Sequence, residues 1–239
     1  LIFIDDGSSD KTWDIISMFS KKDHNINSLK LSKNFGHQAA LKAGFDYAEG
    51  DYIFTLDADH QDPPELLIEM IEKMKNEKLN IVYAQRETSK ESFFKKFTSY
   101  IFYFIFNKIC KINILQQVSD FRLVDSKVLK QLKNINENDL FYRGLIPWMG
   151  FKYSVVKFNR ENRKHGKTGW SLMKMIDFAL TRIFNFSNLP MRLSFLITIL
   201  MIILFLGLSI YALSSYLSGN VIQGWTSTIL VLSFLNIAI

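Results

Sequence analysis

Apolar and polar positions alternate in blocks along the first third of the chain. Short apolar runs at 1–4, 26–31, 52–56 and 80–84 each end in polar or turn-forming residues, which predicts four strands. Helices are predicted between them, over 11–20, 39–48 and 64–76, the last of which begins at a proline. Strands that alternate this regularly with helices predict an α/β fold, a mostly parallel twisted sheet covered by helices on both faces. Ligands of such sheets bind at the carboxyl ends of the strands.

The pattern changes over 93–114, where aromatic and basic residues fill a predicted helix that is apolar around most of its circumference. Two readings remain open. The helix is buried in the core, or it lies in a lipid interface with Lys95, Lys96 and Lys108 toward the headgroups. Cys110, the only cysteine, lies in this segment, so an intramolecular disulfide and a multi-cysteine zinc site are excluded.

The last part of the chain carries no formal charge from Leu193 to Ile239. The runs 191–217 and 221–239 are separated by a short polar turn, and we predict a transmembrane hairpin whose second helix is incomplete. A helix over 171–190 is predicted to lie along the membrane surface, which leaves 1–170 as the globular domain. The chain opens in mid-strand, and we expect a longer natural protein.

The charges are unevenly distributed, because all 29 Lys and Arg and all 23 Asp and Glu precede Leu193. A basic globular part beside an apolar tail predicts contact with an anionic membrane surface or with phosphate-bearing substrates. Nucleic acid is disfavoured, since no basic recognition motif is present. Lys174, Arg182 and Arg192 flank the first predicted span, which places the large domain in the cytoplasm by the positive-inside rule.

Two acidic loops follow predicted strands and are candidates for phosphate or metal chemistry. Asp5 and Asp6 end the first strand, and Asp57-Ala58-Asp59-His60-Gln61-Asp62-Pro63-Pro64 follows the third. Two carboxylates one residue apart at a strand end can turn toward the same point, as a hard divalent cation on a diphosphate requires. The alternative is that each loop is only a turn, since Asp and Pro are common turn residues.

Four motifs occur in an order and at spacings that resemble family-two glycosyltransferases of the polyprenyl-phosphate sugar transferase type. This group includes the dolichyl-phosphate mannose synthases and the bacterial undecaprenyl-phosphate (bactoprenol) glucosyltransferases. The motifs are the two acidic loops, Asn34-x-Gly36 with Ala39 and Gly44, and Asp120-Phe121-Arg122. With the trailing hairpin, the resemblance covers nearly all of the chain. It implies a glycosyltransferase-A (Rossmann-like) fold, with 1–170 as the catalytic domain and the first strand of the family missing from it.

The resemblance also implies roles for the acidic residues. Asp5, Asp6, Asp57 and Ala58 would contact the nucleotide sugar, and Asp57, Asp59 and Gln61 would hold Mg²⁺ or Mn²⁺ against its diphosphate. The cation would neutralise charge on the departing nucleoside diphosphate.

Three further groups of residues match the family pattern. Asp120 and Arg122 would lie near the acceptor, where Arg122 grips the lipid phosphate and Asp120 orients it or contacts metal; a plain salt bridge is the alternative. With Asp59, these two are the predicted catalytic residues. Arg163 and Lys167 lie in a segment that resembles a mobile loop closing over the donor diphosphate. Arg143-Gly144 also matches, without an assignable role.

The implied activity is inverting transfer of one hexose, with UDP-glucose as the preferred donor, to polyprenyl phosphate at the cytoplasmic membrane face. The bacterial look-alikes imply assembly of several copies through the hairpins. An alternative is a capsule or polysaccharide glycosyltransferase of the same fold, which would normally carry a Gln-x-x-Arg-Trp motif; the nearest segment, Glu161-Asn162-Arg163, lacks it. The alternative from another functional class is a non-catalytic membrane scaffold. A scaffold would be expected to have lost the acidic motifs, whereas all four motifs are present.

Overall fold

A computed structural model describes most of the chain. The described residues are 1–87, 104, 106–110, 112–135, 137, 140–159, 181, 183–184, 186–219 and 224–238. The chain divides into two compact units, Leu1–Ala179 and Leu180–Ile239, and each is described by itself.

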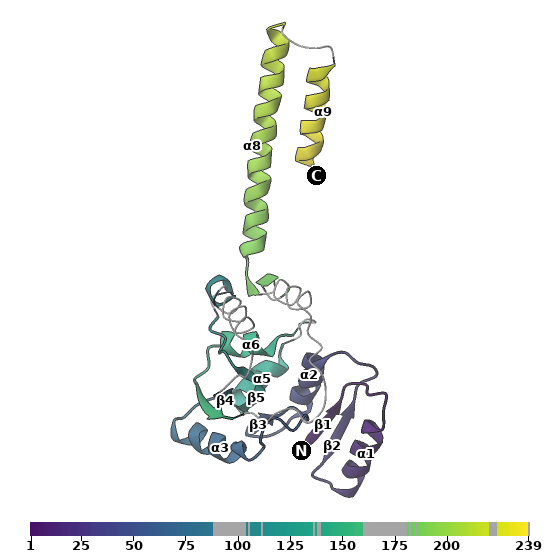
Figure 1. The fold of residues 1–239 in the computed structure, drawn as a ribbon, viewed down its shortest axis with the longest axis vertical. Helices are drawn as coiled ribbons and strands as arrows, with labels where there is room; N and C mark the ends of the chain where they lie inside the picture. Colours follow the sequence, from purple (N-terminus) through teal and green to yellow (C-terminus); the bar gives the residue numbers. More distant parts are fainter. Residues whose placement is uncertain are drawn as a thin grey trace. The chain divides into compact units, whose positions relative to one another are not determined.

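The predicted alternation of strands and helices is confirmed over the first part of the larger unit (Figure 1). Each boundary falls within a few residues of its prediction, as expected from frayed ends. The elements are β1 (Ile2–Asp5), α1 (Thr12–Lys22), β2 (Asn27–Lys30), α2 (His37–Tyr47), β3 (Tyr52–Thr55), α3 (Leu66–Asn76) and β4 (Ile81–Arg86).

The strands form two sheets, and the larger one is mixed. The strands β1 and β2 pair in parallel, while the second sheet has the order β3-β5-β4-β6. In it, β5 (Val118–Asp125) runs antiparallel to both of its neighbours, and β6 (Tyr153–Phe158) is parallel to β4. The α/β fold is therefore confirmed, with an antiparallel strand inserted where the sequence predicted mostly parallel pairing.

One face of the larger sheet carries the apolar core. Alternate residues of the strands pack against α3, because successive side chains of a strand point to opposite faces. Phe121 and Leu123 of β5 have no exposed surface, and the rings of Phe54 and Phe158 lie 5.2 Å and 5.3 Å from that of Phe121. The other members of this cluster are Met70, Met74, Val82, Ala84 and Val156.

The same alternation turns Asp120 and Arg122 of β5 to the opposite face, where α2 and α6 (Tyr142–Trp148) lie. Tyr142 is fully buried, and its ring meets that of Phe45 on α2 edge-on at 5.0 Å. The helix α5 (Ser126–Lys133) follows β5 directly and is capped by Asp125, whose Oδ1 accepts a hydrogen bond from the Val128 amide at 2.9 Å. Two charged residues of β5 thus stand inside a helix-covered face.

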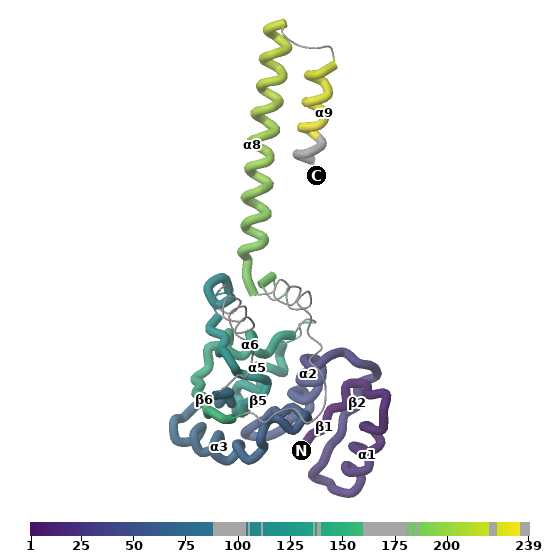
Figure 2. The backbone as a smooth tube through the Cα atoms, in the orientation of Figure 1, coloured from purple at the N-terminus to yellow at the C-terminus, as the bar shows by residue number. Residues whose placement is uncertain are grey.

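The second unit contains one helix that is long and apolar enough to cross a membrane, α8 (Leu189–Leu217). Pro190 lies in its first turn, where proline fits a helix best. The shorter helix α9 (Trp225–Ala238) returns beside it, with the rings of Tyr211 and Trp225 6.1 Å apart (Figure 2). At 14 residues, α9 is shorter than a membrane span. The second transmembrane helix of the predicted hairpin therefore stays a prediction.

Two predicted helices lie largely outside the described residues. Of the aromatic segment 93–114, residues 104, 106–110 and 112–114 are described. Phe106 and Cys110 are buried, at 0% and 9% exposure, whereas Phe104 is 56% exposed. The predicted membrane-surface helix over 171–190 is described only near its end.

Candidate active site

Three strand ends meet at one edge of the larger sheet. The registers pair Thr55 of β3 with Arg122 of β5, and Gln85 of β4 with Val118 of β5. Because β5 is antiparallel to both neighbours, its beginning lies at the edge where β3 and β4 end. This brings Asp120, near the start of β5, beside the acidic loop that follows β3.

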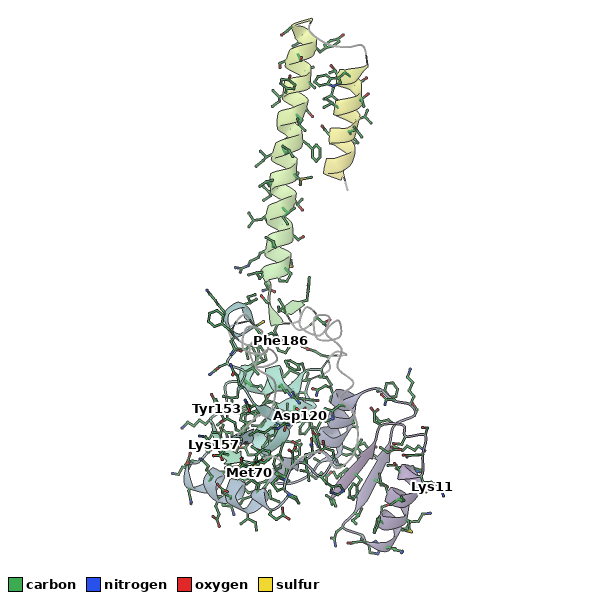
Figure 3. The ribbon with its side chains drawn as sticks, in the orientation of Figure 1. Lys11, Met70, Asp120, Tyr153, Lys157 and Phe186 are labelled. Atoms are coloured by element: carbon green, nitrogen blue, oxygen red, sulfur yellow. The ribbon has the colours of Figure 1, made fainter. Side chains whose placement is uncertain are left out.

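The Asp120 carboxylate is the centre of the site (Figure 3). It is 2% exposed, and one of its oxygens, Oδ1, pairs with the Arg122 guanidinium. The other, Oδ2, lies 3.0 Å from His37 Nε2, 3.4 Å from Gln38 Nε2 and 3.5 Å from Arg143 Nε. Four donors from α2, β5 and α6 therefore converge on one side chain.

These donors decide the charge of Asp120. Burial acts to raise its pKa, but the Arg122 guanidinium, the His37 hydrogen bond and Arg143 outweigh burial and hold the pKa well below its usual range. Asp120 is consequently an anion at neutral pH and a poor proton acceptor. Its place in the site is that of a fixed anchor for cationic side chains.

Arg122 is enclosed by the protein. It is 1% exposed, and its guanidinium also donates to the carbonyls of Ser119 and Tyr142, each at 3.4 Å. Its Cζ lies 5.8 Å from the centre of the Tyr83 ring. The sequence analysis expected Arg122 to grip an acceptor phosphate. The structure has an ion pair with Asp120, the alternative left open there, and β5 points this side chain into the interior. The contact with an acceptor phosphate stays a prediction.

His37 connects the two acidic motifs. Its Nε2 lies 3.8 Å from Asp57 Oδ1 as well as 3.0 Å from Asp120 Oδ2, and its side chain is half exposed. The hydrogen bond to Asp120 raises the pKa of His37 above its usual value, against the opposing effect of burial, and the Asp57 charge adds to the increase. An imidazole whose protonated form is favoured by both neighbours therefore stands between two carboxylates.

Gln38 ties this side of the site to α6. Its Oε1 accepts a hydrogen bond from the Tyr142 amide at 2.9 Å, while its Nε2 donates to Asp120. The Tyr142 carbonyl accepts in turn from Arg122. Asp120, Gln38, Tyr142 and Arg122 thus form a closed ring of contacts that fixes α2, α6 and β5 to one another.

The sequence analysis missed His37 and Gln38 as site residues. Both begin α2 directly after the Asn34-x-Gly36 motif, and Gly36 has a positive φ of 95° that turns the chain into the helix. The Asn34-x-Gly36 motif could have pointed to these two residues, since they follow it directly and are the first of α2 to face the sheet edge. Arg143 was noted as a family match, but without a role.

Asp5 and Asp6 hold the first loop together. The Asp6 oxygens accept from the amides of Phe35 and Gly36, both at 2.8 Å, and Asp5 Oδ1 accepts from the Ser8 amide at 3.1 Å. Asp5 is 2% exposed, and its buried Oδ2 has no hydrogen-bond partner among the described residues. These bonds are those of a turn, and the nucleotide-binding role stays a prediction.

The acidic loop after β3 presents its first carboxylates outward. The Asp57 side chain is 30% exposed, and Ala58 and Asp59 are exposed, whereas Gln61 is buried at 5% exposure. The Gln61 amide donates to Asp59 Oδ1 at 3.1 Å, which tightens the loop. Of the three predicted metal ligands, Asp57 and Asp59 are therefore accessible and Gln61 is buried, and the metal assignment stays a prediction.

The donor set of this loop is compatible with a hard divalent cation. Carboxylate oxygens suit Mg²⁺ or Mn²⁺, which keep waters and substrate phosphates in their remaining positions. Across the described part of the chain, no three His, Cys, Asp or Glu side chains converge as a complete metal site. A cation at Asp57 and Asp59 would thus depend on oxygens from the substrate. Arg163 and Lys167 lie outside the described residues.

The arrangement favours binding and stabilisation of anions. Two basic side chains, His37 and Arg143, are each anchored on Asp120 and each partly exposed, with 50% and 40% of the side chain accessible. His37 also lies beside Asp57, in the carboxylate loop that can hold a divalent cation. Phosphate groups are the ligands for which such a mixture of positive side chains and metal-binding oxygens is suited.

Comparison with known proteins gives a family for this site. A model of the family described as glycosyl transferase family 2 matches residues 1–133. A glycosyltransferase of Bacillus subtilis, YkcC, is 41% identical over 97% of this chain and 72% of its own length. A prophage bactoprenol glucosyl transferase homolog of Escherichia coli is 32% identical over 98% of this chain and 77% of its own. The bactoprenol glucosyl transferase of Shigella phage SfV shows the same identity and coverage.

Among solved structures, a mannosyltransferase from Pyrobaculum calidifontis in complex with GDP-Man and Mn²⁺ resembles the chain with a TM-score of 0.48 and 13% identity. The match covers 71% of this chain and about half, 48%, of that one.

Proposed function

The chain belongs to glycosyl transferase family 2, and from this membership we propose that it transfers one hexose from a nucleotide sugar to the phosphate of a polyprenyl lipid at the cytoplasmic face of a membrane. One observation carries the proposal. The Asp57 loop and Asp120, joined by His37 at a single sheet edge, are encoded in one chain with a 29-residue apolar helix. A phosphate-binding site and a membrane anchor in the same chain suit a lipid phosphate acceptor. Relatives named bactoprenol glucosyl transferase support this choice.

The donor lies on the Asp57 side in this proposal. Asp57 and Asp59 hold the divalent cation, Mg²⁺ or Mn²⁺, and Gln61 joins them only if its inward-turned amide is released. When bound, the cation neutralises charge on the departing nucleoside diphosphate. Asp5, Asp6 and Ala58 are assigned to the nucleotide.

The loop residues Arg163 and Lys167 are assigned to the same diphosphate. Glucose from UDP-glucose is the preferred donor.

The lipid phosphate is itself the nucleophile. Its second pKa is about 6, so it is already ionised at neutral pH and needs no general base. This agrees with Asp120, whose lowered pKa makes it an orienting anion. The phosphate oxygen attacks the anomeric carbon from the face opposite the leaving diphosphate, and the product is a sugar phosphodiester with inverted configuration.

Purified protein in detergent, incubated with Mn²⁺ or Mg²⁺, radiolabelled nucleotide sugars and a short polyprenyl phosphate, tests the proposal. We expect one lipid-linked hexose per acceptor, with UDP-glucose the best donor. Products longer than one sugar would indicate a polysaccharide glycosyltransferase instead. Absence of any product from folded protein with every donor would favour the scaffold.

The matched variants are Asp59→Ala and Glu69→Ala. Asp59→Ala is expected to abolish transfer with an unchanged melting temperature. Glu69 is exposed on α3 and has no assigned role, so its variant should retain full activity. Full turnover by Asp59→Ala would remove the metal assignment.

A further inference from the structure

We infer that Arg143 binds the phosphate of the lipid acceptor, and that the hydrocarbon chain of the acceptor begins beside the apolar residues next to Arg143. This inference rests on the proposed function and gives it an acceptor site. It moves the phosphate contact from Arg122, which is enclosed, to a residue that had no role in the sequence analysis.

The backbone that carries Arg143 is rigidly held. Its neighbour Tyr142 has no exposed surface, donates its amide to Gln38 at 2.9 Å and offers its carbonyl to Arg122 at 3.4 Å. On the other side, Gly144 is buried in α6. This frame fixes the point from which the side chain leaves the backbone, and the contact of its Nε with Asp120 restricts it further. Both reduce the entropy lost when it binds a ligand.

The guanidinium of Arg143 is anchored at one end and available at the other. Its Nε lies 3.5 Å from Asp120 Oδ2, while the side chain is 40% exposed. Asp120 is its only ion-pair partner within the residues that the structure describes. An arginine held through Nε can still present its two terminal nitrogens as a fork, the geometry that matches a phosphate.

The surroundings of Arg143 distinguish the acceptor from the donor. Arg143 lines a small hollow together with Tyr83 and Arg122 and with four apolar residues, Ile114, Leu115, Val118 and Pro147. The diphosphate of a nucleotide sugar is flanked by a ribose and a hexose, whereas a polyprenyl phosphate has its hydrocarbon chain attached directly to the phosphate. A cation beside an apolar hollow therefore fits the acceptor better than the donor.

The order of charged groups supports the same assignment. His37 lies between Asp57 and Asp120, and Arg143 meets Asp120 from α6, an element that does not carry the acidic loop. Donor and acceptor would then lie on two sides of one buried anion. Displacement at the anomeric carbon requires the attacking and leaving oxygens on opposite faces, and two separated phosphate sites meet this requirement.

The test compares Arg143→Gln with Lys152→Gln in the full chain. Lys152 is exposed just before β6, at the sheet edge opposite the site, so its variant removes one positive charge at a distance. For Arg143→Gln we expect KM for the polyprenyl phosphate to rise about tenfold or more, as for loss of a charge-assisted contact. KM for the nucleotide sugar should change less than about twofold, and Lys152→Gln should change neither constant.

Two inhibitors separate the phosphate contact from the hollow. Farnesyl phosphate should compete with the acceptor and farnesol should not, and inhibition by farnesyl phosphate should weaken in Arg143→Gln. Val118→Asp, which puts a charge in the hollow, should weaken inhibition by farnesyl phosphate more than inhibition by inorganic phosphate. Equal loss of both would overturn the assignment of the hollow.

An unchanged acceptor KM in Arg143→Gln overturns the inference, and so does a rise confined to the donor KM, which would place Arg143 at the diphosphate. If Arg143→Gln does not fold, Arg143→Lys carries the test, because it keeps the charge and loses only the fork. A rise in its acceptor KM supports the inference and an unchanged value contradicts it. Failure of the proposed function looks different, since the unaltered chain would then form no lipid-linked sugar.

Discussion

At the scale of single residues, the site is built from charges that burial would normally neutralise. Asp120 and Arg122 are 2% and 1% exposed, respectively, and an ion in such a place is retained only when a partner and further hydrogen bonds compensate its lost hydration. Here the compensation comes from α2 and α6 as well as from β5. Removing one partner should therefore lower the stability of the fold as well as the activity.

Asp120→Asn is expected to lower the free energy of unfolding by about 3–5 kcal/mol, because it leaves the buried Arg122 charge without its counterion. Asp57→Asn is the matched control, since that side chain is 30% exposed, and it should cost less than about 1 kcal/mol. Urea unfolding of the detergent-solubilised chain measures both. The double variant Asp120→Leu, Arg122→Met should be more stable than Asp120→Asn. A loss of stability in Asp120→Asn as small as that in Asp57→Asn would contradict the buried ion pair.

The raised pKa of His37 predicts a pH dependence of stability. A group whose pKa is higher in the folded than in the unfolded chain stabilises the fold most below its unfolded pKa, here the ordinary value of 6.5. This stabilisation is lost as pH rises through the folded pKa. The difference in unfolding midpoint between the unaltered chain and His37→Gln should be largest below pH 6.5 and shrink above it. A difference that grows with pH would show that His37 is not paired with Asp120.

At the scale of elements, β5 explains what the sequence could and could not predict. The strands β1 to β4 were readable because their apolar runs are continuous and bounded by turns. β5 was not, because Ser119, Asp120 and Arg122 interrupt its apolar pattern, and all three are nonetheless buried. Its polar residues are tolerated only through partners from other elements, which no local pattern reveals.

The same argument covers the candidate site. The two acidic loops and Asp120 were found from their motifs, whereas His37 was not, since it meets Asp120 across 83 residues of sequence. Arg122 was expected to hold the acceptor phosphate because Asp120-Phe121-Arg122 matches a family pattern near the acceptor and arginine can grip a phosphate with two nitrogens. The alternation of β5, which became visible only with its pairing, turns that side chain inward.

Two glycines in the first half of the larger unit predict opposite responses to alanine. A Cβ on Gly7, whose φ is +69°, would lie 2.4 Å from the backbone carbon of Lys33, so Gly7→Ala should cost clearly more than about 1 kcal/mol. A Cβ on Gly44 would lie 2.6 Å from Cδ1 of Ile4, the movable end of a side chain. Alanine also favours the α2 helix by about 1 kcal/mol, so Gly44→Ala should be nearly neutral.

Thermal unfolding of the two variants in parallel checks this pair. The Gly7 variant should also loosen the loop that Asp6 holds to Phe35 and Gly36. Faster amide hydrogen exchange over 33–36 would report that loosening, and equal stability of both variants would contradict the close packing at Gly7.

At the scale of the whole molecule, the chain joins a basic α/β unit to an apolar helix. The 29 residues of α8, at about 1.5 Å each, exceed the roughly 30 Å hydrocarbon core of a bilayer. Within the described residues, no part of its most apolar stretch is buried by the rest of the chain. A lipid environment is the partner that such a surface suits, and a lipid phosphate acceptor would be met in the same environment.

The orientation of α8 gives the last prediction. Arg192 is its only charged residue and lies in its first turn, so the end at Ser218 should be translocated while the larger unit stays in the cytoplasm. In a Cys110→Ser background, Ser218→Cys should react with a membrane-impermeant thiol reagent in intact cells. Lys152→Cys, on the larger unit, should react only after permeabilisation. Labelling of the Lys152 variant alone in intact cells would show the opposite topology. The site would then lie outside the cytoplasm, away from the supply of nucleotide sugar.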